Sequence, residues 1–227
     1  MNSPHPLHAP LLDGARALNL PLTEDQASQL LAYLDLLAQW NKVYNLTAVR
    51  DPADMLTHHV LDSLSIIAPL RRHTRSQPVS LLDVGSGGGL PGVAVAIACP
   101  EIRVTCVDAV AKKAAFIQQA AGSLGLPNLR GQHARVQTLR GPFDLIASRA
   151  FASLADFTAW SAGALADGGA WLAMKGKPPV AEIAALPPAV TVFHVEPLAV
   201  PGLDAERCLI WLRRSPLAAR RLPGVES

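Results

Sequence analysis

Hydrophobic and polar residues follow two different periods along this chain, one before and one after residue 79. Across residues 30–38, leucine and alanine recur every three or four positions, which is the spacing of one face of an α-helix. Thr23 and Gln26 fit a capping box, in which each side chain bonds the other's backbone N–H at a helix start. The pattern therefore predicts an amphipathic helix that begins after Thr23 and runs to about Trp40.

A second helical pattern, "MLTHHVLDSLSII", begins at Met55 and is expected to end before Pro69. On such a helix His58 and Asp62 lie one turn apart, where their side chains can pair. An all-helical segment is thus predicted ahead of the change of period.

From Val79 onward, short β-rich runs alternate with helical runs, which is typical of a parallel sheet covered on both faces. Five strands are expected in this part, namely "VSLLDV", "IRVTCVD", a weaker one near "LRGQHA", "FDLIASRA" and "AWLAMKG". The last two β-rich runs, "TVFHVEPLAV" and "RCLIWLRR", have no convincing helix between them and predict an antiparallel pair at the sheet edge. Together these runs predict a seven-stranded α/β sheet.

The stretch "LLDVGSGGGLPG", residues 81–92, places bare backbone between the first strand and the helix that follows it. Gly87, Gly89 and Gly92 fit the G-x-G-x-x-G pattern of dinucleotide sites, a weak signal by itself. Counted from Asp83, the same stretch is Asp-x-Gly-x-Gly-x-Gly, the turn of S-adenosylmethionine (SAM) methyltransferases. The loop alone leaves both ligands open.

Two aspartates bear on this choice. Asp108 lies at the tip of the second strand, where a carboxylate can bind the two ribose hydroxyls of either NAD or SAM. Asp83 favours SAM, because a pyrophosphate prefers helix N-terminal amides without a nearby carboxylate, whereas SAM carries an ammonium and a sulfonium. The antiparallel pair also favours SAM, since a dinucleotide-binding domain usually ends with another parallel unit. An NAD-linked oxidoreductase and a protein that binds SAM without turnover remain the alternatives.

We therefore predict a Rossmann-like, seven-stranded SAM-dependent methyltransferase sheet preceded by an N-terminal helical segment. The expected parts are a flexible N-terminus (1–22), the helical segment (23–78), the SAM-binding domain (79–214) and a flexible basic tail (215–227).

Composition bears on the cellular location of this domain and on the ligands it can bind. The chain has 227 residues, 50% of them hydrophobic, which is ample for a core, and it has neither a long apolar run nor a signal-peptide pattern. A cytoplasmic protein without membrane contact is expected. Cys99, Cys106 and Cys208 are isolated from one another, which favours reduced, buried thiols over a metal site. The net charge of +2 permits nucleic-acid binding without requiring it. Only one of the 20 Lys and Arg residues, Arg16, lies in the first 40 residues, so the positive charge collects on the rest of the chain.

The methyl acceptor is narrowed by motifs that this chain lacks. After the fourth strand it reads Ser148-Arg149-Ala150-Phe151, where base amino-group methyltransferases usually have Asn/Asp-Pro-Pro-aromatic, and no cysteine has the Pro-Cys context of cytosine C5 chemistry. The acceptors that remain are those whose methylation needs no strong base or nucleophile from the protein. Guanine N7 is such an acceptor, because its free lone pair needs positioning rather than proton removal. No catalytic acid or base is therefore expected, and another acceptor remains the alternative.

Four motifs, "WNKVYNLTAVRDPADMLTHHVLDSL", "DVGSGGGLPG", "SRAFASL" and "MKG", make the sequence closely resemble a known family from about Leu30 to Trp211. These are the bacterial 16S ribosomal RNA guanine-N7 methyltransferases, the glucose-inhibited division protein B family. The resemblance implies SAM as methyl donor and, as acceptor, a guanine in the decoding-centre loop of 16S rRNA within the small subunit or its precursor. A monomer is expected.

The resemblance also assigns residues. It implies cofactor contacts at Gly85, Leu90, Val136, Gln137 and Arg149, to which the loop and the strand tip add Asp83, Gly87 and Asp108. Gln137 replaces the family's usual glutamate, so a backbone contact is expected there without a carboxylate contact. Basic positions that match the family and are expected to face RNA are Arg135, Lys175 and Arg207.

Overall fold

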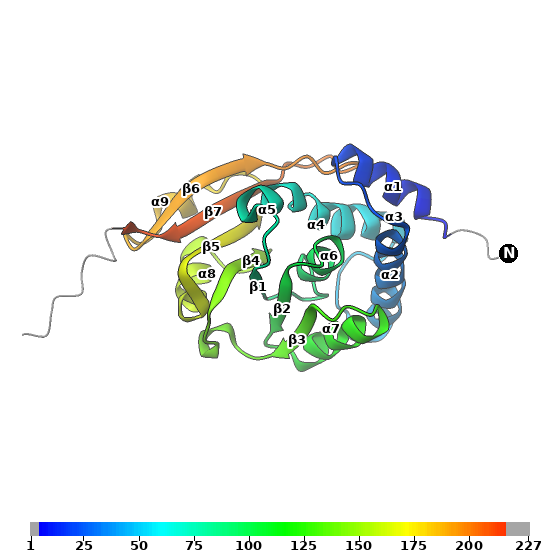
Figure 1. Cartoon of the computed structure of the whole chain (residues 1–227), viewed down its shortest axis with the longest axis horizontal. Coiled ribbons are helices and arrows are strands. Elements are labelled where there is room, and N and C mark those ends of the chain that lie inside the picture. The colour runs from blue at the N-terminus through cyan, green and yellow to red at the C-terminus, as the bar shows by residue number, and fades with distance from the viewer. Residues whose placement is uncertain (1–4, 217–227) are drawn as a thin grey trace, which may run out of the picture.

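The computed structural model describes residues 5–216 of the chain (Figure 1). Apart from Ser215 and Pro216, the predicted basic tail (215–227) lies outside the described residues, as do residues 1–4 of the predicted flexible N-terminus.

A seven-stranded sheet forms the centre of the molecule, with the strand order β3-β2-β1-β4-β5-β7-β6. The first five strands are parallel, whereas β7 runs antiparallel to both β5 and β6, so the prediction of a parallel sheet with an antiparallel edge pair is confirmed. The strands are β1 (Ser80–Val84), β2 (Arg103–Asp108), β3 (Leu129–His133), β4 (Phe143–Arg149), β5 (Leu165–Lys175), β6 (Val190–Pro197) and β7 (Cys208–Arg214).

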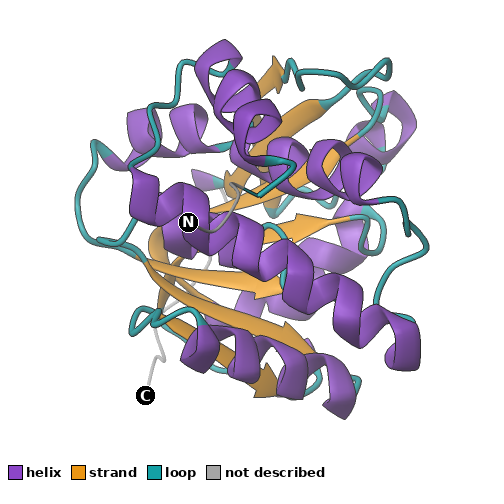
Figure 2. Cartoon of the chain, turned by 90° about the vertical axis from the view of Figure 1, so that its right-hand side faces the viewer, coloured by secondary structure: helices purple, strands orange, loops and turns teal. Residues whose placement is uncertain are grey.

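Helices cover both faces of the sheet (Figures 1 and 2). One face carries the N-terminal helices with α6 (Gly92–Ala98) and α7 (Ala111–Ser123), and the other carries α8 (Leu154–Ser161) and α9 (Val180–Ala184). Side chains alternate between two cores because neighbouring strand residues point to opposite faces. Leu81 packs in the first core and Leu82 in the second, and both are fully buried. The helical segment thus shares one core with the sheet.

Helix α2 (Glu24–Tyr44) begins as predicted, at a capping box. Thr23 Oγ accepts a hydrogen bond from the Gln26 backbone N–H at 3.2 Å, and Gln26 Oε1 accepts one from the Thr23 N–H at 3.1 Å. The helix continues one turn past the predicted end at Trp40, to Tyr44, and Asn45 ends it in the left-handed conformation.

The predicted flexible N-terminus is wrong for much of residues 1–22, because helix α1 (His8–Ala17) forms there. Leu11 and Ala15 are buried in its inner face, and Gly14 packs so closely on Leu61 that an added Cβ would lie 2.7 Å from that side chain. The prolines before the helix suggested a loose segment, but burial of apolar side chains outweighs that local signal.

The second predicted helix is divided into several pieces. Helix α3 (Pro52–Met55) begins at an Asp51 cap, and a π-helical turn, α4 and α5 follow it (Leu56–Leu61, Asp62–Leu64 and Ile67–Thr74). Pro69 lies in the first turn of α5 instead of beyond the end of a helix. Proline is tolerated there because the first N–H groups of a helix have no partner within it. The π-helical turn is a feature often found at functional sites.

Two further observations concern predictions from composition. Cys99, Cys106 and Cys208 are buried free thiols, as predicted. Among residues 5–216, the helices are all too short or too polar to cross a bilayer.

Candidate active site

The glycine loop, residues 85–91, connects β1 to α6 at the carboxyl edge of the parallel strands, the edge at which ligands bind in open α/β sheets. Gly85, Gly87 and Gly89 all have positive φ, at 65°, 57° and 89°. A Cβ at Gly85 would lie 2.3 Å from the Phe151 ring, whereas one at Gly87 would point into open space. The backbone is therefore bare and accessible at Gly87, and closely packed at Gly85.

Asp83 lies behind this loop, fully buried, and lines neither pocket described below. Its Oδ2 accepts a hydrogen bond from the Gly92 N–H at 2.9 Å, while Oδ1 has no partner in the described part of the chain. The carboxyl thus ties the loop to the start of α6, and a direct contact between Asp83 and the cofactor stays a prediction. The burial of Asp83 follows from its position in the strand, because it is two residues from Leu81 and so faces the same core.

Burial raises the pKa of Asp83 from 3.8 to about 7, against the Gly92 hydrogen bond that lowers it. A raised pKa in the folded state stabilises the fold fully below about pH 4, and this contribution is lost as the pH rises to about 7. We expect Asp83→Asn to remove this loss, so that its melting temperature relative to the native protein increases from pH 5 to about pH 7 and then levels off.

Thermal unfolding at a series of pH values measures this difference. Asp144 is the matched control, because hydrogen bonds from Ser80 lower its pKa and place its own titration below this window. For Asp144→Asn, the difference from the native protein should not change between pH 5 and pH 8. A constant difference for Asp83→Asn as well would contradict the raised pKa.

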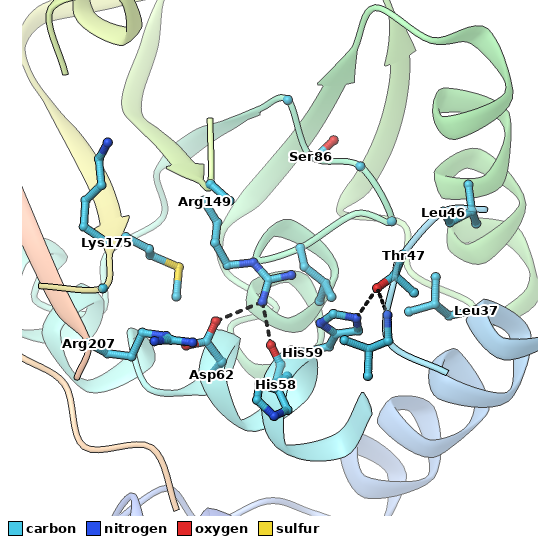
Figure 3. A pocket seen from close by; sticks show the side chains of 18 residues that line it. Leu37, Leu46, Thr47, His58, His59, Asp62, Ser86, Arg149, Lys175 and Arg207 are labelled. Atoms are coloured by element: carbon cyan, nitrogen blue, oxygen red, sulfur yellow. Dashed lines mark hydrogen bonds and ion pairs between the residues drawn. The ribbon is translucent and has the colours of Figure 1, made fainter. Parts of the chain in front are cut away.

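Two pockets open beside the glycine loop, and Gly85 lines both. The larger, with a volume of about 590 Å³, lies between the loop, the segment after α2, the π-helical turn, the tips of β4 and β5 and the start of β7 (Figure 3). The smaller, of about 340 Å³, lies between the tips of β1 and β2 and the residues after β3.

The smaller pocket has the features that an adenosine requires. Its walls are largely apolar, formed by Val84, Val107, Ala109, Val136, Phe151 and Trp160. Asp108 lies in this pocket, and its two oxygens accept hydrogen bonds from the Gly87 and Val110 N–H groups at 3.0 and 2.8 Å. Each carboxylate oxygen has a second lone pair for a ribose hydroxyl. Gln137 and Arg135 line the same pocket.

Arg149 projects from the tip of β4 into the larger pocket (Figure 3). Its Nη1 donates to the His58 carbonyl and to Asp62 Oδ2, both at 2.9 Å. Nε and Nη2 form no hydrogen bond to another residue in the described part of the chain. Two N–H-bearing nitrogens of a fixed guanidinium are therefore available to an anionic group in the pocket.

Asp62 joins two predicted site residues that are distant in sequence. Its Oδ1 accepts from Arg207 Nε at 3.0 Å while Oδ2 binds Arg149, and its side chain is only 4% exposed. The predicted pair between His58 and Asp62 does not form, because the carboxylate turns to the arginines. Sequence reasoning missed this role, since the two partners lie 87 and 145 positions further along the chain.

His59 and Thr47 form another part of the pocket wall. Thr47 Oγ lies 2.7 Å from His59 Nε2, and the buried Nδ1 has no partner in the part of the chain that is described (Figure 3). Burial, assisted by the nearby Arg149 charge, lowers the pKa of His59 below 6.5, so the imidazole is neutral at neutral pH. No feature of the sequence singled out Thr47, His59 or Ser86 as a site residue.

The three predicted RNA-facing residues divide between the two pockets. Arg207 lines the larger pocket, whereas Arg135 lines the smaller one. Lys175 lines the larger pocket, but its ammonium is paired with Glu182 at 3.0 Å and points away from the arginines (Figure 3). The remaining predicted cofactor residues divide between the pockets, with Gly87 and Leu90 in the larger and Val136 and Gln137 in the smaller.

Solved structures resemble this fold at low sequence identity. TrmN from Thermus thermophilus matches with a TM-score of 0.52 at 19% identity, over 70% of this chain and 53% of that one. The ribosomal protein L11 methylase from Lactobacillus delbrueckii subsp. bulgaricus matches with a TM-score of 0.51 at 16% identity, over 68% and 77%. At such identities the likeness shows the fold alone.

Sequence relatives are much closer. Residues 26–210 match the family model GidB, described as rRNA small subunit methyltransferase G. A protein from Acidovorax sp. (strain JS42) is 68% identical over an alignment of 211 residues that covers 89% of this chain and 93% of the relative. One from Polaromonas sp. (strain JS666 / ATCC BAA-500) is 65% identical over an alignment of 210 residues that covers 91% of this chain and 93% of the relative. Both relatives are named ribosomal RNA small subunit methyltransferase G.

Proposed function

This chain belongs to the GidB family of rRNA small subunit methyltransferases, and on that premise we propose that it methylates N7 of a guanine in the decoding-centre loop of 16S rRNA. S-adenosylmethionine is the methyl donor. The observation that carries the proposal is the pair of pockets that meet at Gly85, one suited to an adenosine and the other spacious and positively charged.

The residues present fit the cofactor. Asp108, Val136 and Gln137 would hold the adenosine in the smaller pocket, and Gly85, Gly87, Leu90 and Arg149 would hold the methionine part where the pockets meet. Gln137 offers an amide in place of the family's usual carboxylate, so its side chain adds no negative charge to this pocket. When bound, S-adenosylmethionine supplies a methyl group activated by its sulfonium.

The larger pocket positions the acceptor. Guanine N7 carries a lone pair and no proton, so the pocket has to orient the base and exclude water, and no residue has to remove a proton. Both oxygens of Asp62 bind arginines, and His59 is neutral, which fits this requirement. The Arg149 and Arg207 guanidiniums suit an anionic backbone or the polar edge of a base.

In this proposal the protein acts as a monomer, in the cytoplasm, on 16S rRNA within the small subunit or its precursor. The family membership and the arginines of the larger pocket support the rRNA substrate.

Methyl transfer to small ribosomal subunits tests the proposal. Subunits from cells that lack this protein are incubated with the purified enzyme and labelled S-adenosylmethionine, and the rRNA is digested for nucleoside mass mapping. We expect 7-methylguanosine at a single position in the decoding-centre loop, and no label in subunits that are already methylated. Label in a different nucleoside, or in ribosomal protein, would overturn the assignment.

A further inference from the structure

Exposed apolar side chains and lysines gather where α2 ends and α7 begins. Val43 and Tyr44, in the last turn of α2, are 70% and 38% exposed, and Val110, just before α7, is 39% exposed. Single exposed apolar residues are common on protein surfaces and need no explanation. Here they occur together with three lysines, and we call the set of Lys42, Val43, Tyr44, Val110, Lys112 and Lys113 the α2–α7 rim.

Aromatic packing holds the rim in a fixed position. The Tyr44 ring lies 5.0 Å from the Trp40 ring, which in turn lies 5.4 Å from Phe116 of α7. Phe116 packs near Tyr33, whose hydroxyl donates to the Gly88 carbonyl at 2.6 Å. The Tyr44 ring is thus supported by packed aromatic rings that extend to the glycine loop.

The rim is positively charged. Lys112 Nζ lies over the Tyr44 ring, 5.8 Å from its centroid, which is a cation–π arrangement. Within residues 5–216 neither Lys42 nor Lys112 forms an ion pair, and Lys113 is 3.9 Å from Asp108. A lysine without an ion-pair partner beside a half-exposed aromatic ring, as Lys112 is beside Tyr44, matches the groups with which proteins hold single-stranded nucleic acid.

The rim also adjoins both pockets. Directly after Tyr44 and Asn45, the chain enters the wall of the larger pocket at Leu46 and Thr47 (Figure 3). On the other side, the Val110 N–H donates to Asp108, which lines the smaller pocket. A nucleotide bound on the rim would therefore be a near neighbour of the target guanine.

We propose that the α2–α7 rim binds an unpaired nucleotide beside the target guanine, with its base stacked on Tyr44 and its phosphate held by Lys112. This inference rests on the proposed function, because it assumes an RNA substrate. A guanine that presents N7 to the pocket must leave its stack, which leaves the neighbouring base free to stack on an aromatic ring. Sequence-independent stacking of this kind tolerates any base, and the lysines make binding dependent on salt.

The test uses Tyr44→Leu, Tyr44→Phe and Lys112→Ala in the full chain, with intact small subunits as substrate. We expect Tyr44→Leu to raise the KM for subunits about tenfold, and Tyr44→Phe to keep the native KM, because the phenyl ring still stacks. Lys112→Ala should reduce the slope of log KM against log salt by about one. The affinity for S-adenosylmethionine and the melting temperature should stay at native values in all three.

Phe193→Leu is the matched control. Phe193 is also 38% exposed, and the Arg213 guanidinium lies 5.3 Å from its ring centroid. It lines neither pocket, and its strand, β6, is at the opposite edge of the sheet from β3, against which α7 packs. Its KM should not change.

If Tyr44→Leu keeps the native KM for subunits while the native enzyme methylates rRNA, nucleotide binding at the α2–α7 rim is refuted and the proposed function stands. Loss of binding in Phe193→Leu equal to that in Tyr44→Leu would also overturn the inference. The same holds if a photocrosslinker at position 44 attaches to a ribosomal protein instead of rRNA. Absence of rRNA methylation by the native enzyme would instead reject the proposed function.

Discussion

Replacement of Arg149 by lysine is expected to lower kcat/KM for subunit methylation about 100-fold. The guanidinium holds His58 and Asp62 through Nη1, while Nε and Nη2 form no hydrogen bond within residues 5–216 and can bind a ligand in the pocket that Arg149 lines; a single ammonium cannot do both. Two lost hydrogen bonds to a charged group, at about 1.5 kcal/mol each, correspond to roughly this factor. Because lysine keeps the charge beside Asp62, the melting temperature of the free protein should change by only a few degrees.

Calorimetry with S-adenosylmethionine shows which ligand Arg149 binds. A loss of cofactor affinity that matches the loss of kcat/KM is expected. Native cofactor affinity with a raised KM for subunits would place Arg149 on the RNA instead. Arg214→Lys is the control, because Arg214 also ends a strand and pairs with an aspartate, Asp167 at 3.1 Å, away from both pockets. Arg214→Lys should retain native activity, and native activity in Arg149→Lys would show that Arg149 is not a recognition residue.

Asp62→Asn is expected to reduce both stability and activity. The asparagine oxygen can accept from one arginine, but its amide then presents a donor to the other, which leaves a mostly buried guanidinium without its partner. Removing one member of a buried ion pair costs about 3 kcal/mol, which for a domain of this size lowers the melting temperature by roughly 6–12 °C. Activity should fall further than in Arg149→Lys, because Arg149 and Arg207 both lose their fixed positions.

Thermal unfolding and subunit methylation at a temperature well below the transition measure the two effects separately. Asp54→Asn is the control, since Asp54 belongs to the preceding helix, is exposed and forms no ion pair with the residues that the structure describes. That variant should be indistinguishable from the native protein. An Asp62→Asn variant that melts and methylates normally would show that the two arginines are held by other contacts.

The sequence by itself determined the features that depend on near neighbours in the chain. The run "VSLLDV" predicted a strand covered on both faces, and Leu81 and Leu82 lie in opposite cores because adjacent strand residues point to opposite faces. The Thr23 and Gln26 capping box marked the start of α2 for the same reason, since its bonds span only three residues. The glycine loop and Asp108 indicated where a ligand would lie, because parallel strands end at the same edge.

Tertiary structure alone decided the features that depend on distant partners. Asp62, which lies in the first family motif and was expected to pair with His58, binds Arg149 and Arg207 instead. Such pairs form only after the sheet has brought together segments far apart in the chain, and no local pattern encodes them. Helix α1 also depends on distant partners, because Leu11 is buried only when the rest of the fold supplies its neighbours. The charge of the pocket is therefore set by packing between elements, while its location is set by the order of the strands.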